Sequence, residues 1–100
     1  MLESIKNELG IDENDSNDIV QDLIDAGKAD LILSGVHKDK AKDTDPLIKR
    51  AIILYCKANY RYDPFTERYQ ELYKSLKHHL TLSVEYTEVV EWIYISNLTI

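Results

Sequence analysis

Apolar side chains recur every three or four residues in two consecutive stretches of the chain, and each stretch begins with Asp-Pro. Asp45 and Asp63 can each accept hydrogen bonds from the amides of a first helical turn, while the following proline has a preset φ and no amide to satisfy. The spacing predicts helices near 46–61 and 64–82. Their core-facing residues are Leu47, Ile48, Ala51, Ile52, Tyr55 and Ala58 in the first, and Phe65, Tyr69, Leu72, Tyr73, Leu76 and Leu80 in the second.

The same spacing predicts two earlier helices, near 2–9 and 17–33. Gly10 suits the left-handed position that closes the first helix, and Ile11 can then fold back onto its apolar side. Gly27 weakens the interior of the second helix, so we expect a close helix crossing there in preference to a bend. The apolar sets are Leu2, Ile5 and Leu9 in the first helix and Ile19, Val20, Leu23, Ile24, Leu31 and Ile32 in the second.

The helix near 46–61 is more apolar than one buried face requires, because Ile53, Leu54 and Cys56 lie off its main stripe. It is therefore predicted to be the central helix, packed on two sides within the bundle or on one side against another subunit. Tyrosine is unusually frequent, with seven residues, and a tyrosine suits the edge of a core because its hydroxyl can stay in contact with water. We expect four at the edge of the core between the two Asp-Pro helices: Tyr55, Tyr62, Tyr69 and Tyr73.

The last segment, from Val84 to Ile100, is rich in β-branched and aromatic residues and contains no Gly or Pro. This composition predicts an extended tail that needs a partner, because one strand alone cannot satisfy its edges. A neighbouring copy, a larger partner, folding back onto the helices or an irregular helix are all open. The candidate interface residues are Tyr86, Val89, Val90, Trp92, Ile93, Tyr94 and Ile95. We therefore expect a mostly α-helical fold: a bundle of three to four helices over 1–83, followed by a partner-docking tail over 84–100.

The stretch 34–44 alternates Lys and Asp and is predicted to be an exposed loop. It is either a contact surface for an acidic partner or DNA, or a solvated connection kept soluble by its mixed charges. The candidate contact residues are His37, Lys38, Lys40 and Lys42.

A combination of these packing residues resembles the small head-tail connector, or adaptor, proteins of tailed bacteriophages and their prophage relatives. The resemblance covers about residues 16–83. The residues that carry it are Asp45-Pro46-Leu47-Ile48, Ala51, Ile52, Leu54, Tyr55, Lys57, Ala58, Tyr69, Leu72, Tyr73, Leu76, Lys77, Leu80, Leu82 and Ser83.

The resemblance implies a structural subunit in the virion, present in the host cytoplasm before assembly. Such subunits are expected to form a ring, dodecameric in the family, beneath the portal at the capsid vertex. The ring prolongs the DNA channel and joins the portal to a tail-completion or stopper protein. No catalytic, metal-binding or cofactor-binding residue is carried over.

Length and composition limit the classes of function that the chain can have. One hundred residues make one domain, and a net charge of −6 with a pI near 4.9 makes general attraction to nucleic acid improbable. A single cysteine, Cys56, indicates a reduced intracellular origin. The first ten residues lack the pattern expected of a signal peptide, and 84–100 is expected to be too short and too acidic for a membrane span.

Candidate chemistry is sparse, and we expect no enzyme activity, no metal and no cofactor. His78 and His79 are adjacent on a helix, so their side chains diverge by about 100° and cannot share one metal ion. A regulatory protein-protein interaction module remains the alternative function. A helix-turn-helix DNA-binding domain is disfavoured, because 34–44 is too long for the usual turn and Arg50, Arg61 and Arg68 do not form a basic face.

Overall fold

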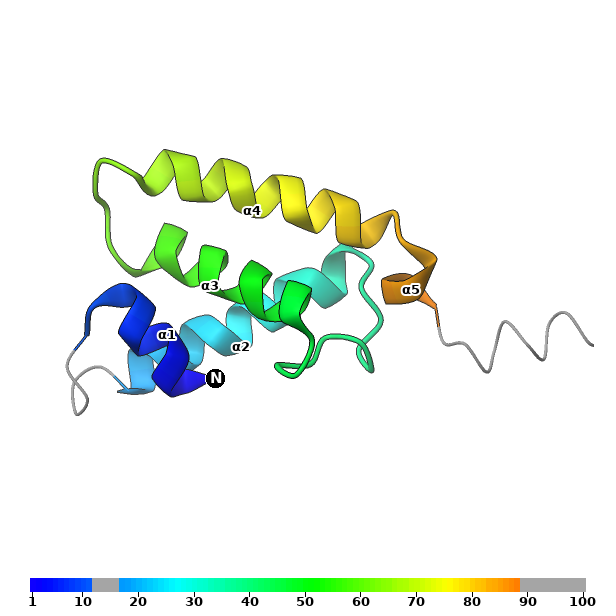
Figure 1. Cartoon of the computed structure of the whole chain (residues 1–100), viewed down its shortest axis with the longest axis horizontal. Helices are drawn as coiled ribbons and strands as arrows, with labels where there is room; N and C mark the ends of the chain where they lie inside the picture. The colour runs from blue at the N-terminus through cyan, green and yellow to red at the C-terminus, as the bar shows by residue number, and fades with distance from the viewer. Residues whose placement is uncertain (12–16, 89–100) are drawn as a thin grey trace, which may run out of the picture.

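The computed structural model describes residues 1–11 and 17–88, and within these ranges every regular element is helical. Helix α3 lies between α4 on one side and α1 and α2 on the other, and α5 packs at one end of the molecule (Figure 1). The small helical bundle predicted from the sequence is confirmed. In chain order the helices are α1 (Leu2–Leu9), α2 (Asn17–Ser34), α3 (Pro46–Tyr60), α4 (Thr66–Thr81) and the single turn α5 (Val84–Thr87).

Helix α3 begins as its Asp-Pro pair predicts. The carboxylate of Asp45 accepts hydrogen bonds from the backbone N–H groups of Leu47 at 2.9 Å and Ile48 at 3.1 Å, and Pro46 is the first helical residue. These two bonds satisfy amides that have no partner within the helix.

Helix α4 begins at Thr66, two residues later than predicted. Asp63 still caps the turn, since its carboxylate accepts from the N–H of Phe65 at 2.7 Å, and the Thr66 hydroxyl accepts from the N–H of Asp63 at 2.8 Å. This reciprocal pair leaves Pro64 and Phe65 in a tight turn that precedes the α-helix, a common difference at helix ends.

Helix α1 ends at the predicted glycine. Gly10 adopts the left-handed conformation with φ of 71°, and the N–H of Ile11 donates to the carbonyl of Lys6 at 3.0 Å. This turn brings Ile11 back against the core, as expected. The Lys6 side chain is only 1% exposed, and its Nζ lies 2.5 Å from Oδ1 of Asn17, which joins α1 to the start of α2.

The core is built around α3, as the sequence predicts. Ile48, Ile52 and Cys56 are completely buried, and the residues off the main stripe, Ile53 and Leu54, are buried as well. Helix α3 packs against both α2 and α4 and also contacts α1. Its apolar surface is therefore largely used within the chain.

Gly27 marks a close crossing of α2 and α3, as expected. A methyl group at Gly27 would lie 3.2 Å from Cδ1 of Tyr55. The ring of Tyr55 is itself packed edge-on against Tyr73 of α4, with ring centroids 5.3 Å apart. The glycine thus allows α2 to approach an aromatic pair between α3 and α4.

A polar cluster beside this pair ties α2 to α4. The Tyr73 hydroxyl donates to Asp30, and Lys77 Nζ lies 3.0 Å from the same carboxylate. Burial by itself raises the pKa of Asp30, but the hydrogen bonds from Tyr73 and Lys77 outweigh it, and the pKa lies below its usual value. Burial and the hydrogen bond to Asp30 raise the pKa of Tyr73.

Several residues predicted for the core or its edge are exposed instead. Tyr62 is 82% exposed because it lies in the non-helical link between α3 and α4, and Phe65 is 62% exposed because it precedes the helical part of its stripe. The other exposed apolar residues lie near the ends of helices, which neighbouring helices do not cover, or line a groove between two helices. These further exceptions are Ile19, Ile32, Leu47 and Leu72.

Two further details differ from expectation. The 34–44 loop is less exposed than its charges suggest, because Val36 and Ala41 are buried in the core. The tail is not extended from its first residue, because Val84–Thr87 forms one helical turn, as the irregular-helix alternative allowed. Glu88, the last described residue, has extended backbone with φ of −129° and ψ of 157°. Residues 89–100 lie outside the described residues.

Candidate functional site

The 34–44 loop and the start of the C-terminal segment meet at one end of the bundle (Figure 1). The N–H of His37 donates to the carbonyl of Tyr86 at 2.8 Å, and the Tyr86 hydroxyl lies 3.1 and 3.0 Å from the two carboxylate oxygens of Asp45. Burial, followed by the hydrogen bond to Asp45, raises the pKa of Tyr86 to about 12. Two candidates that the sequence placed in separate surfaces, His37 and Tyr86, are therefore neighbours.

Local hydrogen bonds give the loop a defined shape. The N–H of Lys40 donates to the carbonyl of His37 at 2.8 Å, and the N–H of Asp45 donates to the carbonyl of Lys42 at 3.1 Å. Lys38 and Lys42 are exposed, whereas Lys40 is half-buried. The side chains thus lie where a partner could reach them, and their role as contacts stays a prediction.

Only Tyr86 of the predicted tail interface belongs to the described residues. The other members lie outside them: Val89, Val90, Trp92, Ile93, Tyr94 and Ile95.

Exposed apolar side chains gather at the same end as the loop. Leu33 at the end of α2 is 86% exposed, and Leu82 and Val84, which flank the turn between α4 and α5, are 70% and 57% exposed. The two helix ends are close together, because a Cβ at Gly35 would lie 3.7 Å from the Thr81 methyl group. We call Leu33, Leu82 and Val84 the end surface.

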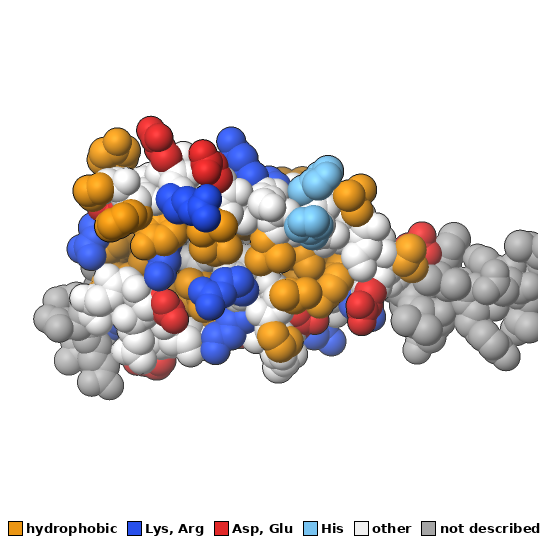
Figure 2. All heavy atoms as spheres, turned by 45° about the horizontal axis from the view of Figure 1, so that its top comes forward, with side chains coloured by type: hydrophobic (Ala, Val, Ile, Leu, Met, Phe, Trp, Pro, Cys, Tyr) orange, Lys and Arg blue, Asp and Glu red, His pale blue; other side chains and the backbone are white. Residues whose placement is uncertain are grey.

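A second surface runs between α3 and α4. It is a groove of about 440 Å³ lined by Arg50, Leu54, Leu72, Ser75, Leu76 and His79. Figure 2 shows this side of the molecule, where hydrophobic side chains form a band between basic ones, with the histidines near one end. This groove was not predicted from the sequence. The excess of apolar residues on α3, including Leu54, was the signal that pointed to it.

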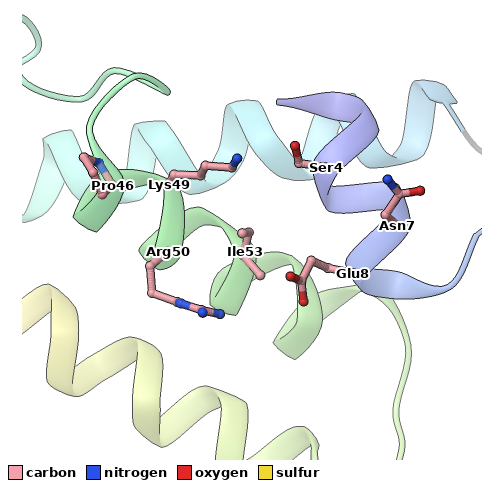
Figure 3. Close-up of a pocket in the computed structure, with 7 residues that line it drawn as sticks. All are labelled: Ser4, Asn7, Glu8, Pro46, Lys49, Arg50 and Ile53. Carbon is pink, nitrogen blue, oxygen red and sulfur yellow. The ribbon is translucent and has the colours of Figure 1, made fainter.

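A more polar hollow of about 710 Å³ lies between α1 and α3 and shares Arg50 with the groove. Figure 3 shows Lys49 extending along α3 toward α1, while Arg50 extends toward α4. Glu8, at the α1 side, is 3.3 Å from Lys57. Within the described residues neither Lys49 nor Arg50 forms an ion pair, so this side of α3 presents two basic groups without a carboxylate partner.

Comparison with known protein families decides the class of protein. A family model described as "Phage connector protein" matches residues 1–87. The chain belongs to the phage connector family. No curated protein and no solved structure matches the chain.

The match confirms the resemblance seen in the sequence and extends it to both ends of the helical bundle. It takes in α1 and α5 of the connector, and therefore the contact between Tyr86 and the 34–44 loop. The family assigns the connector a structural role in the phage.

The lone cysteine of the connector is buried. Burial raises the pKa of the Cys56 thiol to about 12, which leaves it protonated and unreactive at neutral pH. Within residues 1–11 and 17–88, no three His, Cys, Asp or Glu side chains come together to hold a metal ion. None of the described helices has the length and apolar character needed to cross a bilayer.

Proposed function

We propose that this phage connector is a structural subunit of the virion that assembles as a ring beneath the portal. The ring extends the DNA channel and offers the surface to which the tail-completion or stopper protein attaches. The family match over residues 1–87 is the observation that carries the proposal.

The distribution of exposed apolar side chains supports an assembly role. Single exposed hydrophobic residues are normal on soluble proteins, but clusters of them mark interaction sites. The end surface carries three of them, near the ends of α2 and α4 and at the start of α5. We propose that this end faces the portal and that the helical sides of the bundle contact neighbouring subunits.

The proposal is tested by mixing the purified chain with portal rings of the same phage and measuring the mass of the complex by light scattering. We expect several copies per portal, with fewer bound when Leu33→Asp and Leu82→Asp are combined. Tyr62→Asp is the matched control, because Tyr62 is equally exposed but lies in the link between α3 and α4. A wild-type chain that does not bind portal rings would contradict the proposed function.

The position in the virion is tested separately. Phage that lack this protein should accumulate capsids without tails, and adding the purified protein should restore tail joining. Normal tailed particles in its absence would count against a connector role.

A further inference from the structure

The groove between α3 and α4 has the character of a binding site for an acidic, apolar chain segment. Leu54 and Leu76 form its less exposed part, Leu72 is 36% exposed within it, and Arg50 and His79 lie at its margins. Leu47 lies on the same side of α3 as Arg50 and Leu54, because they are three and seven residues away, and it is 47% exposed. Leu47 continues the apolar strip toward the start of α3.

The basic groups beside this strip favour an acidic occupant. Arg50 lines the groove and has no carboxylate partner among the described residues, and His79 lies at another margin of the groove. A charge at the rim of an apolar site contributes mainly to the choice of partner and its register. A segment with carboxylates among large apolar side chains therefore complements this groove.

The chain itself contains such a segment. Residues 88–100 read EVVEWIYISNLTI, which combines Glu88 and Glu91 with large apolar side chains and contains no Lys or Arg. We propose that residues 88–96 of one copy dock in the α3–α4 groove of a second copy, with Glu91 facing Arg50 and Trp92 against the leucines. The inference rests on the proposed function in one respect, because a ring requires a contact between neighbouring copies.

The length of the segment is sufficient. The groove follows α4 from Leu72 to His79, which is about 10 Å at the helical rise. An extended chain covers that distance in about four residues, and the segment beyond Glu88 spans up to roughly 40 Å when extended. Enough chain remains to cross from one copy to the next.

Two features favour a second copy over the chain's own groove. Tyr86 holds α5 at the end of the molecule through Asp45 and His37, so the described chain ends at Glu88, away from the middle of α3 and α4 (Figure 1). A return to its own groove requires the chain to turn back from this end toward α3 and α4. The sequence there is Val89-Val90, and β-branched residues are poor in tight turns, which use Gly, Pro, Asn, Asp or Ser.

The geometry of such a contact also agrees with a ring. A segment of one copy in the groove of the next is a heterologous, head-to-tail contact, and contacts of this kind generate rings when the rotation closes. Each copy supplies one segment and one groove, so a closed ring leaves neither unused.

A charge-swap experiment on the full chain tests the inference. Arg50→Glu and Glu91→Arg are each measured for self-association by light scattering, with Trp92 fluorescence as a second readout. In a solution of one variant alone, residues 50 and 91 of neighbouring copies carry charges of the same sign. We therefore expect about tenfold weaker association and a more exposed Trp92. A mixture of the two variants restores the opposite charges across copies and should recover wild-type association.

Further variants separate charge from folding. Lys74→Glu makes the same charge change on α4 outside the groove, where Lys74 lies near Tyr55 and Tyr73, and it should associate like wild type. Leu72→Asp should weaken association without loss of helical circular dichroism, because Leu72 is already partly exposed.

The outcomes that overturn the inference are distinct. If both charge variants associate like wild type and still fill portal rings cooperatively, the groove contact is wrong while the proposed function stands. If Trp92 is buried in a dilute monomer, becomes exposed in Arg50→Glu, and is not restored by mixing, the segment occupies its own groove. A wild-type chain that binds portal without cooperativity and stays monomeric at its highest soluble concentration also contradicts a contact between copies.

Discussion

Replacing Gly27 by alanine tests the close approach of α2 and α3. An alanine in a helix interior is favoured over glycine by about 1 kcal/mol, so propensity alone predicts a more stable protein. The added methyl group, however, would lie 3.2 Å from Cδ1 and 3.3 Å from Cγ of Tyr55, closer than an ordinary contact. The Tyr55 ring also packs edge-on against Tyr73, and this contact restricts its movement away from α2.

Overpacking of this kind costs about 1–3 kcal/mol, so the two effects together leave Gly27→Ala about 1 kcal/mol less stable than wild type. Gly27→Val adds two more carbon atoms at the same point and should lose about 3 kcal/mol. The assay is urea unfolding followed by circular dichroism, and each kcal/mol should also shift the melting temperature by about 4–8 °C.

The Tyr55→Ala background provides the control. Without the ring, Gly27→Ala should become stabilising by about 0.5–1 kcal/mol, because only the helical preference remains. Ala29→Gly, at an exposed position of the same helix, should cost about 1 kcal/mol and calibrates that preference. A Gly27→Ala protein that is more stable than wild type in the presence of Tyr55 would refute the crossing argument.

Three further predictions concern single side chains. Asp45→Ala removes both the cap of α3 and the acceptor for Tyr86 and should cost about 2 kcal/mol in urea unfolding, whereas Tyr86→Phe should cost about 1 kcal/mol; equal losses would contradict the double role. The raised pKa of Cys56, about 12, predicts that a thiol reagent labels the folded chain no faster than it unfolds, and immediate labelling by mass spectrometry would contradict burial. Although burial raises it, hydrogen bonds lower the pKa of Asp30, so its contribution to stability is present above the unfolded pKa of about 3.9 and is lost as the pH falls through the lower folded value. Acid unfolding of Asp30→Asn should show a weaker pH dependence in that window, and a curve parallel to wild type would contradict the assignment.

Local signals in the sequence were enough to predict the four longer helices, α1 to α4, and their order. Capping residues act within one turn, so Asp45 and Gly10 reveal helix ends without knowledge of the rest of the fold. The central position of α3 was also predictable, since Ile53 and Leu54 need burial that a single face cannot provide.

Exposure was less predictable because it depends on where the neighbouring helices end. The apolar spacing of Leu47 and Phe65 matches a buried stripe, but among residues 1–11 and 17–88 no element covers the first turn of α3 or the turn before α4 far enough to bury them. Lys6 shows the opposite case, because a lysine on a short amphipathic helix is expected in water. It is nevertheless 1% exposed, and its Nζ hydrogen-bonds Asn17, which the chain brings next to it at the start of α2.

The candidate site was predictable only in part. His37 and Tyr86 were predicted as contact residues from the sequence. The hydrogen bond between them joins positions far apart in the chain, so no local sequence pattern could predict it. The groove was harder to predict, because it forms between two helices and each of its leucines, taken alone, has the spacing of an ordinary core residue.

The shared carboxylate of Asp45 has a consequence for how this chain can change during evolution. The Asp45 side chain accepts hydrogen bonds both from the first turn of α3 and from the Tyr86 hydroxyl. Fewer substitutions can therefore replace it than either role alone would permit. Serine or threonine could replace it as a cap, but neither offers a second acceptor oxygen to the phenol. In related chains we expect the two positions to vary together, with an aspartate opposite a tyrosine and a hydroxyl cap opposite a phenylalanine. A survey of related sequences in which the two vary independently would show that the link matters only in this chain.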